Sequence, residues 1–221
     1  MDPALAHIDA WIFDLDNTLY PASCDLFGLI DRRMTDHVAR VTGLPRDEAY
    51  QAQKRWFREH GTTLSGMMAE HGVDPHAFLE DVHAIELDAL AEDRRLIGAI
   101  ARLPGRKLVF TNGDAPYART VLARLGLGTT FEAIHDIHAC AYQPKPMAAA
   151  YASMVAAFGI DPARSLFADD LQRNLLPAKA IGMTTLWINN GSEPQGAAEP
   201  HIDFSTDDLG RWLADTMGPH A

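Results

Sequence analysis

The strongest constraint on the fold is a series of short apolar runs separated by helical patterns. The first run, residues 10–13, reads Ala-Trp-Ile-Phe and is followed at once by Asp14-Leu15-Asp16-Asn17. An apolar run this short, bounded by turn-forming residues, is typical of a strand buried on both faces. Four similar runs follow at residues 107–110, 132–134, 165–168 and 184–188, and helical patterns lie among them at 115–125, 146–158 and 175–181. This alternation predicts an α/β fold in which helices cover both faces of a parallel sheet.

A long helical insertion interrupts this rhythm after the first run. Residues 14–106 separate the first expected strand from the second, whereas a crossover between parallel strands needs only about a dozen residues. Helical periodicity is clearest at residues 29–41, 46–60 and 75–90, and we find no convincing strand pattern there. We therefore expect a core domain of residues 1–20 and 103–221, with a helical domain of residues 21–102 inserted after the first strand. An edge strand near 202–204 and a last helix at 209–216 would complete the core.

Composition disfavours several classes of function. The 221 residues carry 30 acidic and 19 basic side chains, a net charge of −11, with no Lys/Arg-rich run. Such a chain repels polyphosphate backbones, so we expect no nucleic-acid polymer as partner. No apolar run approaches the roughly 18 residues of a membrane-spanning helix, and the N-terminus lacks the features of a secretion signal. The two cysteines, Cys24 and Cys140, are expected to be free thiols in a reducing cytoplasm. The sequence leaves the oligomeric state open.

Polar residues follow three of the expected strands at the edge where open α/β sheets bind ligands. Asp14 and Asp16 follow the first strand, Thr111-Asn112-Gly113 the second and Asp169-Asp170 the fourth, and Lys145 lies in a Gln-Pro-Lys-Pro loop before a helix. Two carboxylates about 4 Å apart repel by about 4 kcal/mol at an effective dielectric constant of about 20. A divalent cation would offset this repulsion, and an all-oxygen ligand set favours a hard ion, Mg²⁺. Together with Lys145, the ion would attract a small anion such as a phosphate monoester.

These motifs, taken in order, resemble those of the haloacid dehalogenase superfamily of phosphotransferases. The matching segments are Asp14-Leu15-Asp16-Asn17-Thr18-Leu19-Tyr20, Thr111-Asn112-Gly113, Lys145-Pro146, and Phe167-Ala168-Asp169-Asp170 followed by Asn174-Leu175. The segment His60-Gly61-Thr62-Thr63-Leu64 and the long insertion also resemble the pyrimidine 5′-nucleotidase-like subgroup and its cap. The resemblance implies a Rossmann-like core with an inserted helical cap domain.

The resemblance also implies catalytic roles for the matched residues. Asp14 would be the nucleophile that becomes an aspartyl-phosphate, and Asp16 would protonate the leaving oxygen and then activate water. Thr111-Asn112-Gly113 would hold a phosphate oxygen, and Lys145 would neutralise the transferring group. General acid–base help of this kind contributes about 10²–10⁴-fold to the rate.

A magnesium site is implied in the same way. Its ligands would be oxygen atoms from Asp14, the Asp16 backbone carbonyl, Asp170 and, indirectly or through water, Asp169. The sequence departs from the family pattern at two positions near this site. Asn174 stands where an acidic residue is common, and Leu171 stands where a small hydroxyl residue is usual. We therefore assign the direct metal contact to Asp170 and an indirect or water-mediated one to Asp169.

The expected function is a Mg²⁺-dependent phosphatase for small phosphate monoesters, and the subgroup resemblance favours nucleoside 5′-monophosphates. His60, Thr62 and Thr63 in the insertion are candidates for selecting the leaving group. Two alternatives stay open. A metal-independent 2-haloacid dehalogenase would use the same nucleophile, but a leaving halide needs no proton and would give Asp16 no task. A non-catalytic phosphate-binding regulatory module would use a similar acidic cluster, yet this chain keeps every catalytic residue type.

Overall fold

The computed structural model describes residues 2–193 and 199–218. The chain divides into two units, one formed by Met1–Cys24 with Leu90–Ala221 and the other by Asp25–Ala89. The first is named the sheet unit and the second the helical unit.

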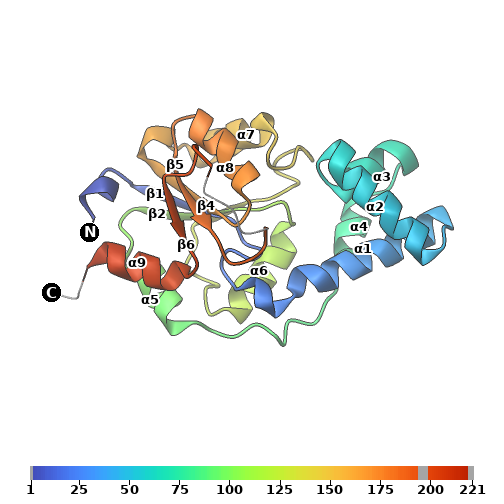
Figure 1. Cartoon of the computed structure of the whole chain (residues 1–221), viewed down its shortest axis with the longest axis horizontal. Helices are drawn as coiled ribbons and strands as arrows, with labels where there is room; N and C mark the ends of the chain where they lie inside the picture. Colours follow the sequence, from blue (N-terminus) through green and yellow to red (C-terminus); the bar gives the residue numbers. More distant parts are fainter. Residues whose placement is uncertain (1, 194–198, 219–221) are drawn as a thin grey trace. The chain divides into compact units, whose positions relative to one another are not determined.

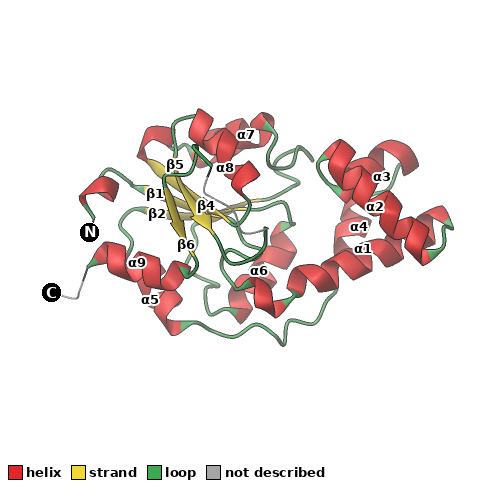
Figure 2. Ribbon diagram, in the orientation of Figure 1, coloured by secondary structure: helices red, strands yellow, loops and turns green. Residues whose placement is uncertain are grey.

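The sheet unit is built on parallel strands in the order β3-β2-β1-β4-β5-β6. Figure 2 draws the strands in yellow with helices around them. Their bounds are β1 Ala10–Phe13, β2 Arg106–Phe110, β3 Ala133–His135, β4 Ser165–Asp169, β5 Thr184–Ile188 and β6 Phe204–Thr206. β1 lies in the centre of the sheet, between β2 and β4, and all of its residues are buried. Because β2 and β4 lie on opposite sides of β1, the carboxyl end of β1 is a switch point, where open α/β sheets bind ligands.

Helices cover both faces of this sheet. Figure 1 shows α7 and α8 on one side and α5, α6 and α9 on the other. Their bounds are α5 Arg94–Arg102, α6 Ala115–Arg124, α7 Ala148–Phe158, α8 Gln172–Ala180 and α9 Leu209–Met217, and short 3₁₀ turns lie at Pro3–Leu5, Ala22–Cys24 and Pro162–Arg164. Tyr151 and Met154 of α7 are buried in one cluster with Ile12, Phe110 and Phe167 of the strands. The α/β fold expected from the apolar runs is thereby confirmed.

The helical unit consists of α1 Leu26–Thr42, α2 Arg46–His60, α3 Thr63–His71 and α4 Pro75–Val82. α1 packs against α2 and α4, and α2 packs against α3. Trp56, Met67 and Phe78 are buried. α4 begins as the sequence indicates, because the Asp74 side chain accepts the Ala77 N–H at 2.8 Å and Pro75 occupies the first turn.

The structure differs from the sequence-based expectations at several boundaries. The inserted unit spans Asp25–Ala89 rather than 21–102, because α5 packs against α9 of the sheet unit. α4 ends at Val82 rather than continuing to 90, α3 was not expected, and the last strand lies at Phe204–Thr206 rather than 202–204. α7 begins at Ala148 instead of 146, and α8 begins at Gln172 instead of 175.

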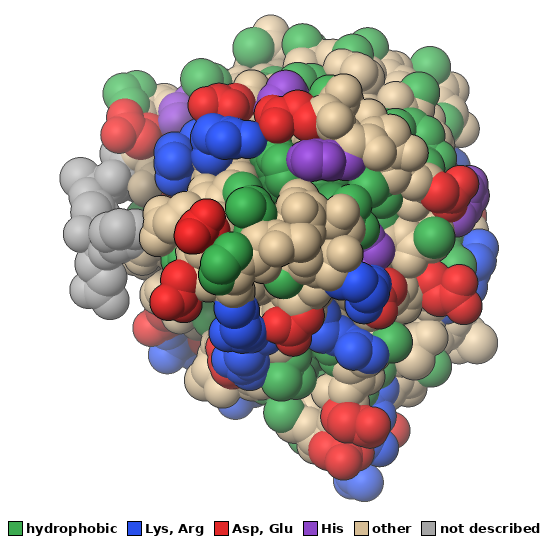
Figure 3. All heavy atoms as spheres, turned by 90° about the vertical axis from the view of Figure 1, so that its right-hand side faces the viewer, with side chains coloured by type: hydrophobic (Ala, Val, Ile, Leu, Met, Phe, Trp, Pro, Cys, Tyr) green, Lys and Arg blue, Asp and Glu red, His purple; other side chains and the backbone are tan. Residues whose placement is uncertain are grey.

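The surface and hydropathy agree with the composition. On the face drawn in Figure 3, acidic and basic side chains are interspersed rather than gathered by sign. Within residues 2–193 and 199–218, no helix is both long enough and apolar enough to cross a membrane.

Candidate active site

Asp14 lies at the carboxyl end of β1 and is held from several directions. Its N–H donates to the Ala168 carbonyl at 2.9 Å, which continues the pairing of β1 with β4. Asn17 has a left-handed backbone conformation (φ 57°), which asparagine tolerates better than most residues, and the chain turns back here. The Thr18 hydroxyl therefore donates to Asp14 Oδ2 at 3.1 Å. The Asp14 side chain is buried, so a nucleophile at this position would act out of bulk water.

Lys145 supplies the positive charge at the centre of the site. Its Nζ donates to Asp14 Oδ1 at 2.7 Å, to Asp169 Oδ2 at 2.8 Å and to the Phe110 carbonyl at 3.1 Å, which uses all three ammonium protons. The side chain is only 2% exposed. Burial alone would lower the pKa of Lys145, but Asp14 and Asp169 outweigh it and raise that pKa above its ordinary value. The lysine therefore stays charged.

Asn112 clamps the backbone of Lys145. Its side-chain Oδ1 accepts the Lys145 N–H at 2.8 Å, and its Nδ2 donates to the Lys145 carbonyl at 3.2 Å. The amide group is thereby engaged at both ends, which fixes the loop that carries the lysine. We expected Asn112 among the phosphate-binding residues, through the amide that follows Thr111, and its side chain in addition positions Lys145.

Thr111 and Gly113 complete the turn after β2. The Gly113 N–H donates to Thr111 Oγ1 at 3.0 Å, so this amide is engaged within the turn. The Thr111 hydroxyl oxygen is used here as an acceptor, which leaves its own proton for another partner. Among the described residues the Asn112 N–H has no recorded acceptor. The donors that fit a phosphate oxygen are thus the Thr111 hydroxyl and the Asn112 amide, rather than the Gly113 amide.

Asp169 and Asp170 differ in how their carboxylates are used. Asp169 accepts from the Leu171 N–H at 2.9 Å, from Asn174 Nδ2 at 3.0 and 3.1 Å, and from Lys145. Both of its oxygens are therefore engaged by protein donors. The Asp170 carboxyl has Ser192 as a polar neighbour, which opposes the rise in its pKa. Asn174, the departure from the family pattern, is explained by its bonds to Asp169.

The buried carboxylates lie close enough to share one cation. Oxygens of Asp14, Asp169 and Asp170 lie within 4.8 Å of one another. Burial first, and then Asp169, raises the pKa of Asp14 to about 7 although Lys145 opposes the shift. Burial first, and then Asp169 and Asp14, raises the pKa of Asp170 to about 8. The neighbouring carboxylates contribute to both shifts because the single positive charge of Lys145 does not compensate all of them. Carboxylate oxygens are ligands that suit Mg²⁺. Asp14 and Asp170 would hold it, since Asp169 is already engaged.

The Asp16 side chain is held by two tyrosines. Its Oδ1 accepts the Tyr20 hydroxyl at 2.6 Å and the Tyr117 hydroxyl at 2.8 Å. Burial, and then the Asp16 charge, raises the pKa of each tyrosine above its ordinary value, so both remain donors. Sequence reasoning missed both tyrosines. Tyr20 lies within the first motif, and Tyr117 follows the second motif in the first turn of α6.

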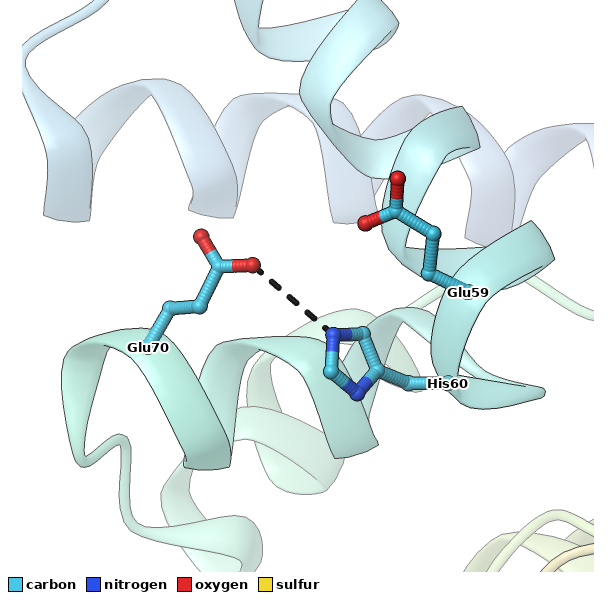
Figure 4. A group of neighbouring side chains, drawn as sticks. All are labelled: Glu59, His60 and Glu70. Atoms are coloured by element: carbon cyan, nitrogen blue, oxygen red, sulfur yellow. Dashed lines mark ion pairs between the residues drawn. The ribbon is translucent and has the colours of Figure 1, made fainter.

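The candidate specificity residues have local partners in the helical unit. His60 Nε2 lies 3.7 Å from Glu70 Oε1 (Figure 4). Thr62 caps α3 by accepting the Ser65 N–H at 3.0 Å, and Thr63 is buried. One possible metal-ligand atom from each of Glu59, His60 and Glu70 also lies within 4.8 Å of the other two. Arg55 pairs with both glutamates, at 3.6 and 3.0 Å, so one positive charge already offsets part of their negative charge.

Comparison with known proteins matches the part of the chain that builds this site. Residues 8–182 match the family model of haloacid dehalogenase-like hydrolases. Phosphate metabolism protein 8 of Saccharomyces cerevisiae is 25% identical over 194 residues, which cover 78% of this chain and 59% of the yeast protein. The match therefore spans less than two thirds of that relative. Phosphoglycolate phosphatase of Pseudomonas putida is 25% identical over 225 residues, 94% of this chain and 79% of that protein.

Solved structures share the fold over nearly the whole chain. A phosphatase from Thermococcus onnurineus superposes with a TM-score of 0.65 at 18% identity, covering 96% of this chain and 98% of the other. L-2-haloacid dehalogenase from Xanthobacter autotrophicus superposes with a TM-score of 0.57, also at 18% identity, covering 93% and 97%. At these identities the likeness concerns the fold, and the two enzymes differ in chemistry. The site residues must decide between such activities.

Proposed function

The chain belongs to the haloacid dehalogenase-like hydrolase family, and on that premise we propose that it is a Mg²⁺-dependent phosphatase of small phosphate monoesters. The observation that carries the proposal is the second carboxylate, Asp16, which lies two residues after the buried Asp14 and is held by two tyrosine hydroxyls. A phosphate ester needs a proton on its leaving oxygen, whereas a leaving halide does not. The curated relatives include a phosphatase.

The reaction would run in two steps through Asp14. An Asp14 carboxylate oxygen attacks the phosphorus, the bond from phosphorus to the ester oxygen breaks, and that oxygen takes a proton from Asp16. In the second step Asp16, now a carboxylate, takes a proton from water as the water oxygen attacks the phosphorus. The bond from phosphorus to Asp14 then breaks, which releases inorganic phosphate and restores both carboxyl groups.

The remaining residues would bind and stabilise charge. The Thr111 hydroxyl and the Asn112 N–H would donate to phosphoryl oxygens, and Lys145 would offset the charge that builds on them. Asp14, Asp170 and the Asp16 carbonyl oxygen would hold Mg²⁺, which when bound supplies further positive charge to the transferring group. Asp169 would act indirectly by fixing Lys145.

For the substrate we propose a nucleoside 5′-monophosphate, on the resemblance of the first motif and of the segment His60-Gly61-Thr62-Thr63-Leu64 to the pyrimidine 5′-nucleotidase-like subgroup. The helical unit would act as the cap that selects the leaving group, with His60, Thr62 and Thr63 as its specificity residues. The name of the Pseudomonas putida relative indicates a smaller substrate for that protein, phosphoglycolate, so both classes belong in one screen.

A phosphate-release screen with and without Mg²⁺ tests this function. The panel would hold nucleoside monophosphates, sugar phosphates, cofactor phosphates and phosphoglycolate, with 2-haloacids assayed for halide. We expect Mg²⁺-dependent phosphate release that is abolished in Asp14→Asn while circular dichroism shows an unchanged fold. Halide release that survives EDTA would instead indicate the dehalogenase. Binding of Mg²⁺ or phosphate without any turnover would indicate the regulatory module.

A further inference from the structure

Two buried phenols converge on a single oxygen of Asp16. Tyr20, in the turn after β1, donates to Oδ1 at 2.6 Å, and Tyr117, in α6, donates to the same atom at 2.8 Å. The two tyrosines are 3% and 5% exposed. They come from segments nearly a hundred residues apart in the sequence, so the convergence is a tertiary arrangement and not a local turn.

We propose that Tyr20 and Tyr117 are positioning residues that fix the Asp16 carboxyl group and thereby assign proton transfer to its other oxygen, Oδ2. This inference rests on the proposed phosphatase function. It assigns different roles to the two oxygens of the Asp16 carboxyl group: Oδ1 anchors the side chain, and Oδ2 exchanges the proton.

The chemistry of the carboxyl group supports this division. In the protonated acid, the carbonyl oxygen keeps two lone pairs, and two O–H donors match them. If the proton sits on Oδ2, both tyrosine bonds persist in the acid form as well as in the carboxylate form. Proton transfer then requires no rearrangement around Asp16, which is the condition under which preorganised polar groups help catalysis most.

Loss of either hydroxyl would loosen this arrangement. The terminal torsion of an aspartate is broad and has no strong preference of its own, so one remaining bond leaves the carboxyl group freer to turn. Proton donation to the leaving oxygen should then suffer, while attack by Asp14 should not. The effect should therefore grow as the leaving group becomes more basic.

The test compares two aryl phosphates of similar size in Tyr117→Phe, Tyr20→Phe and the double variant. p-Nitrophenyl phosphate has a good leaving group, and phenyl phosphate has a more basic one. We would measure kcat/KM, which reports the steps up to release of the first product and so excludes the later attack by water. For each single variant we expect kcat/KM for phenyl phosphate to fall by about tenfold, and that for p-nitrophenyl phosphate to fall by less than about threefold.

The ratio of the two kcat/KM values is the decisive readout. Both substrates are measured on one preparation, so the ratio does not depend on how much of a variant is folded. Tyr50→Phe is the matched control, because that exposed tyrosine lies on α2 of the helical unit, and it should leave the ratio unchanged. An unchanged ratio in both Tyr20→Phe and Tyr117→Phe would overturn the proposal. If the wild-type protein hydrolysed neither ester, the phosphatase function itself would fail.

Discussion

At the scale of single residues, the site is a buried charge cluster with more anions than cations. Lys145 contacts Asp14 and Asp169 directly, and Asp170 lies close to both carboxylates. Asp169 gains four protein hydrogen bonds and so acts as the anchor for the lysine. The uncompensated negative charge falls on Asp14 and Asp170, whose pKa values are raised first by burial and then by the neighbouring carboxylates. A cation would therefore be bound by Asp14 and Asp170 and not by Asp169.

Lys145→Met should lower both stability and activity. Methionine has a side chain of similar length, but it leaves the buried carboxylates of Asp14 and Asp169 without their counter-ion. Such a loss typically costs about 3–5 kcal/mol of unfolding free energy. Urea unfolding in EDTA would measure the loss, and phosphate release in Mg²⁺ should fall to background. Lys179→Met is the matched control, because Lys179 pairs with Asp203 at 2.6 Å while 41% of its side chain is exposed. An exposed pair contributes only about 0–1 kcal/mol, so equal losses in the two variants would contradict this account.

Part of the site follows from the sequence, and part does not. Asp14, Asp169 and Asp170 come together because parallel strands end at one edge of the sheet, and Lys145 joins them from the loop between β3 and α7. The tyrosines that hold Asp16 and the side-chain clamp of Asn112 depend on where side chains point after the loops fold. Sequence spacing carries no such directions between distant segments. Reasoning from the motif alone therefore identified the charged groups and missed those that position them.

At the scale of elements, the strands were easier to predict than the inserted helices. The central strands β1, β4 and β5 are short runs that are almost entirely buried, and the expected bounds of β1 and β5 agree with the structure. α3 was missed because its sequence, Thr-Leu-Ser-Gly-Met-Met-Ala-Glu-His, lacks a clear apolar stripe. α5 does have such a stripe, yet periodicity cannot say which unit buries it. Its apolar face packs on α9, which only the tertiary structure reveals.

Gly66→Ala and Gly98→Ala should have opposite effects on stability. A Cβ at Gly66 of α3 would lie 2.4 Å from Cβ and Cγ of the buried Trp56, so α2 and α3 would have to separate. Overpacking of this kind costs about 1–3 kcal/mol. A Cβ at Gly98 of α5 would meet nothing within 4 Å, and replacing a helical glycine with alanine gains about 0.5–1 kcal/mol. Urea unfolding of both variants checks the pair. Stabilisation by Gly66→Ala would refute the close packing of α2 on α3.

At the scale of the whole molecule, the uncompensated negative charge of the site adds to that of an already acidic chain, whose net charge is −11. Self-repulsion of like charges disfavours the compact state, and the surface shown in Figure 3 relieves it by interspersing basic and acidic side chains. The buried cluster is not relieved in this way, because little of it is exposed to bulk solvent, where salt would screen its charge. Its charge must be removed by protons or balanced by a bound cation, which links the stability of the sheet unit to pH and to Mg²⁺.

Metal-free protein should lose stability as the pH rises toward 8, and Mg²⁺ should restore it. The pKa of Asp14 rises from 3.8 to about 7 on folding, and that of Asp170 from 3.8 to about 8. Between these values the folded state binds more protons than the unfolded state, so stability is present at low pH and is lost as the pH rises through 7 and 8. Mg²⁺ would bind the deprotonated carboxylates, and at about 100 times its Kd it would contribute about 2.7 kcal/mol.

Thermal unfolding in EDTA and in Mg²⁺, from about pH 5 to about pH 8.5, measures this linkage. We expect the increase in Tm caused by Mg²⁺ to be small at the acidic end and to grow through neutral pH. Asp170→Asn removes one titrating group and one ligand together, so it should flatten the pH dependence in EDTA and reduce the effect of Mg²⁺. Groups remote from this site should titrate equally in both proteins, which makes the wild type and this variant a matched pair. An equal rise in Tm with Mg²⁺ at both ends of the range would show that the ion binds elsewhere. Asp14 and Asp170 must lose their protons before they bind Mg²⁺, so the affinity of this site for the ion has to increase with pH.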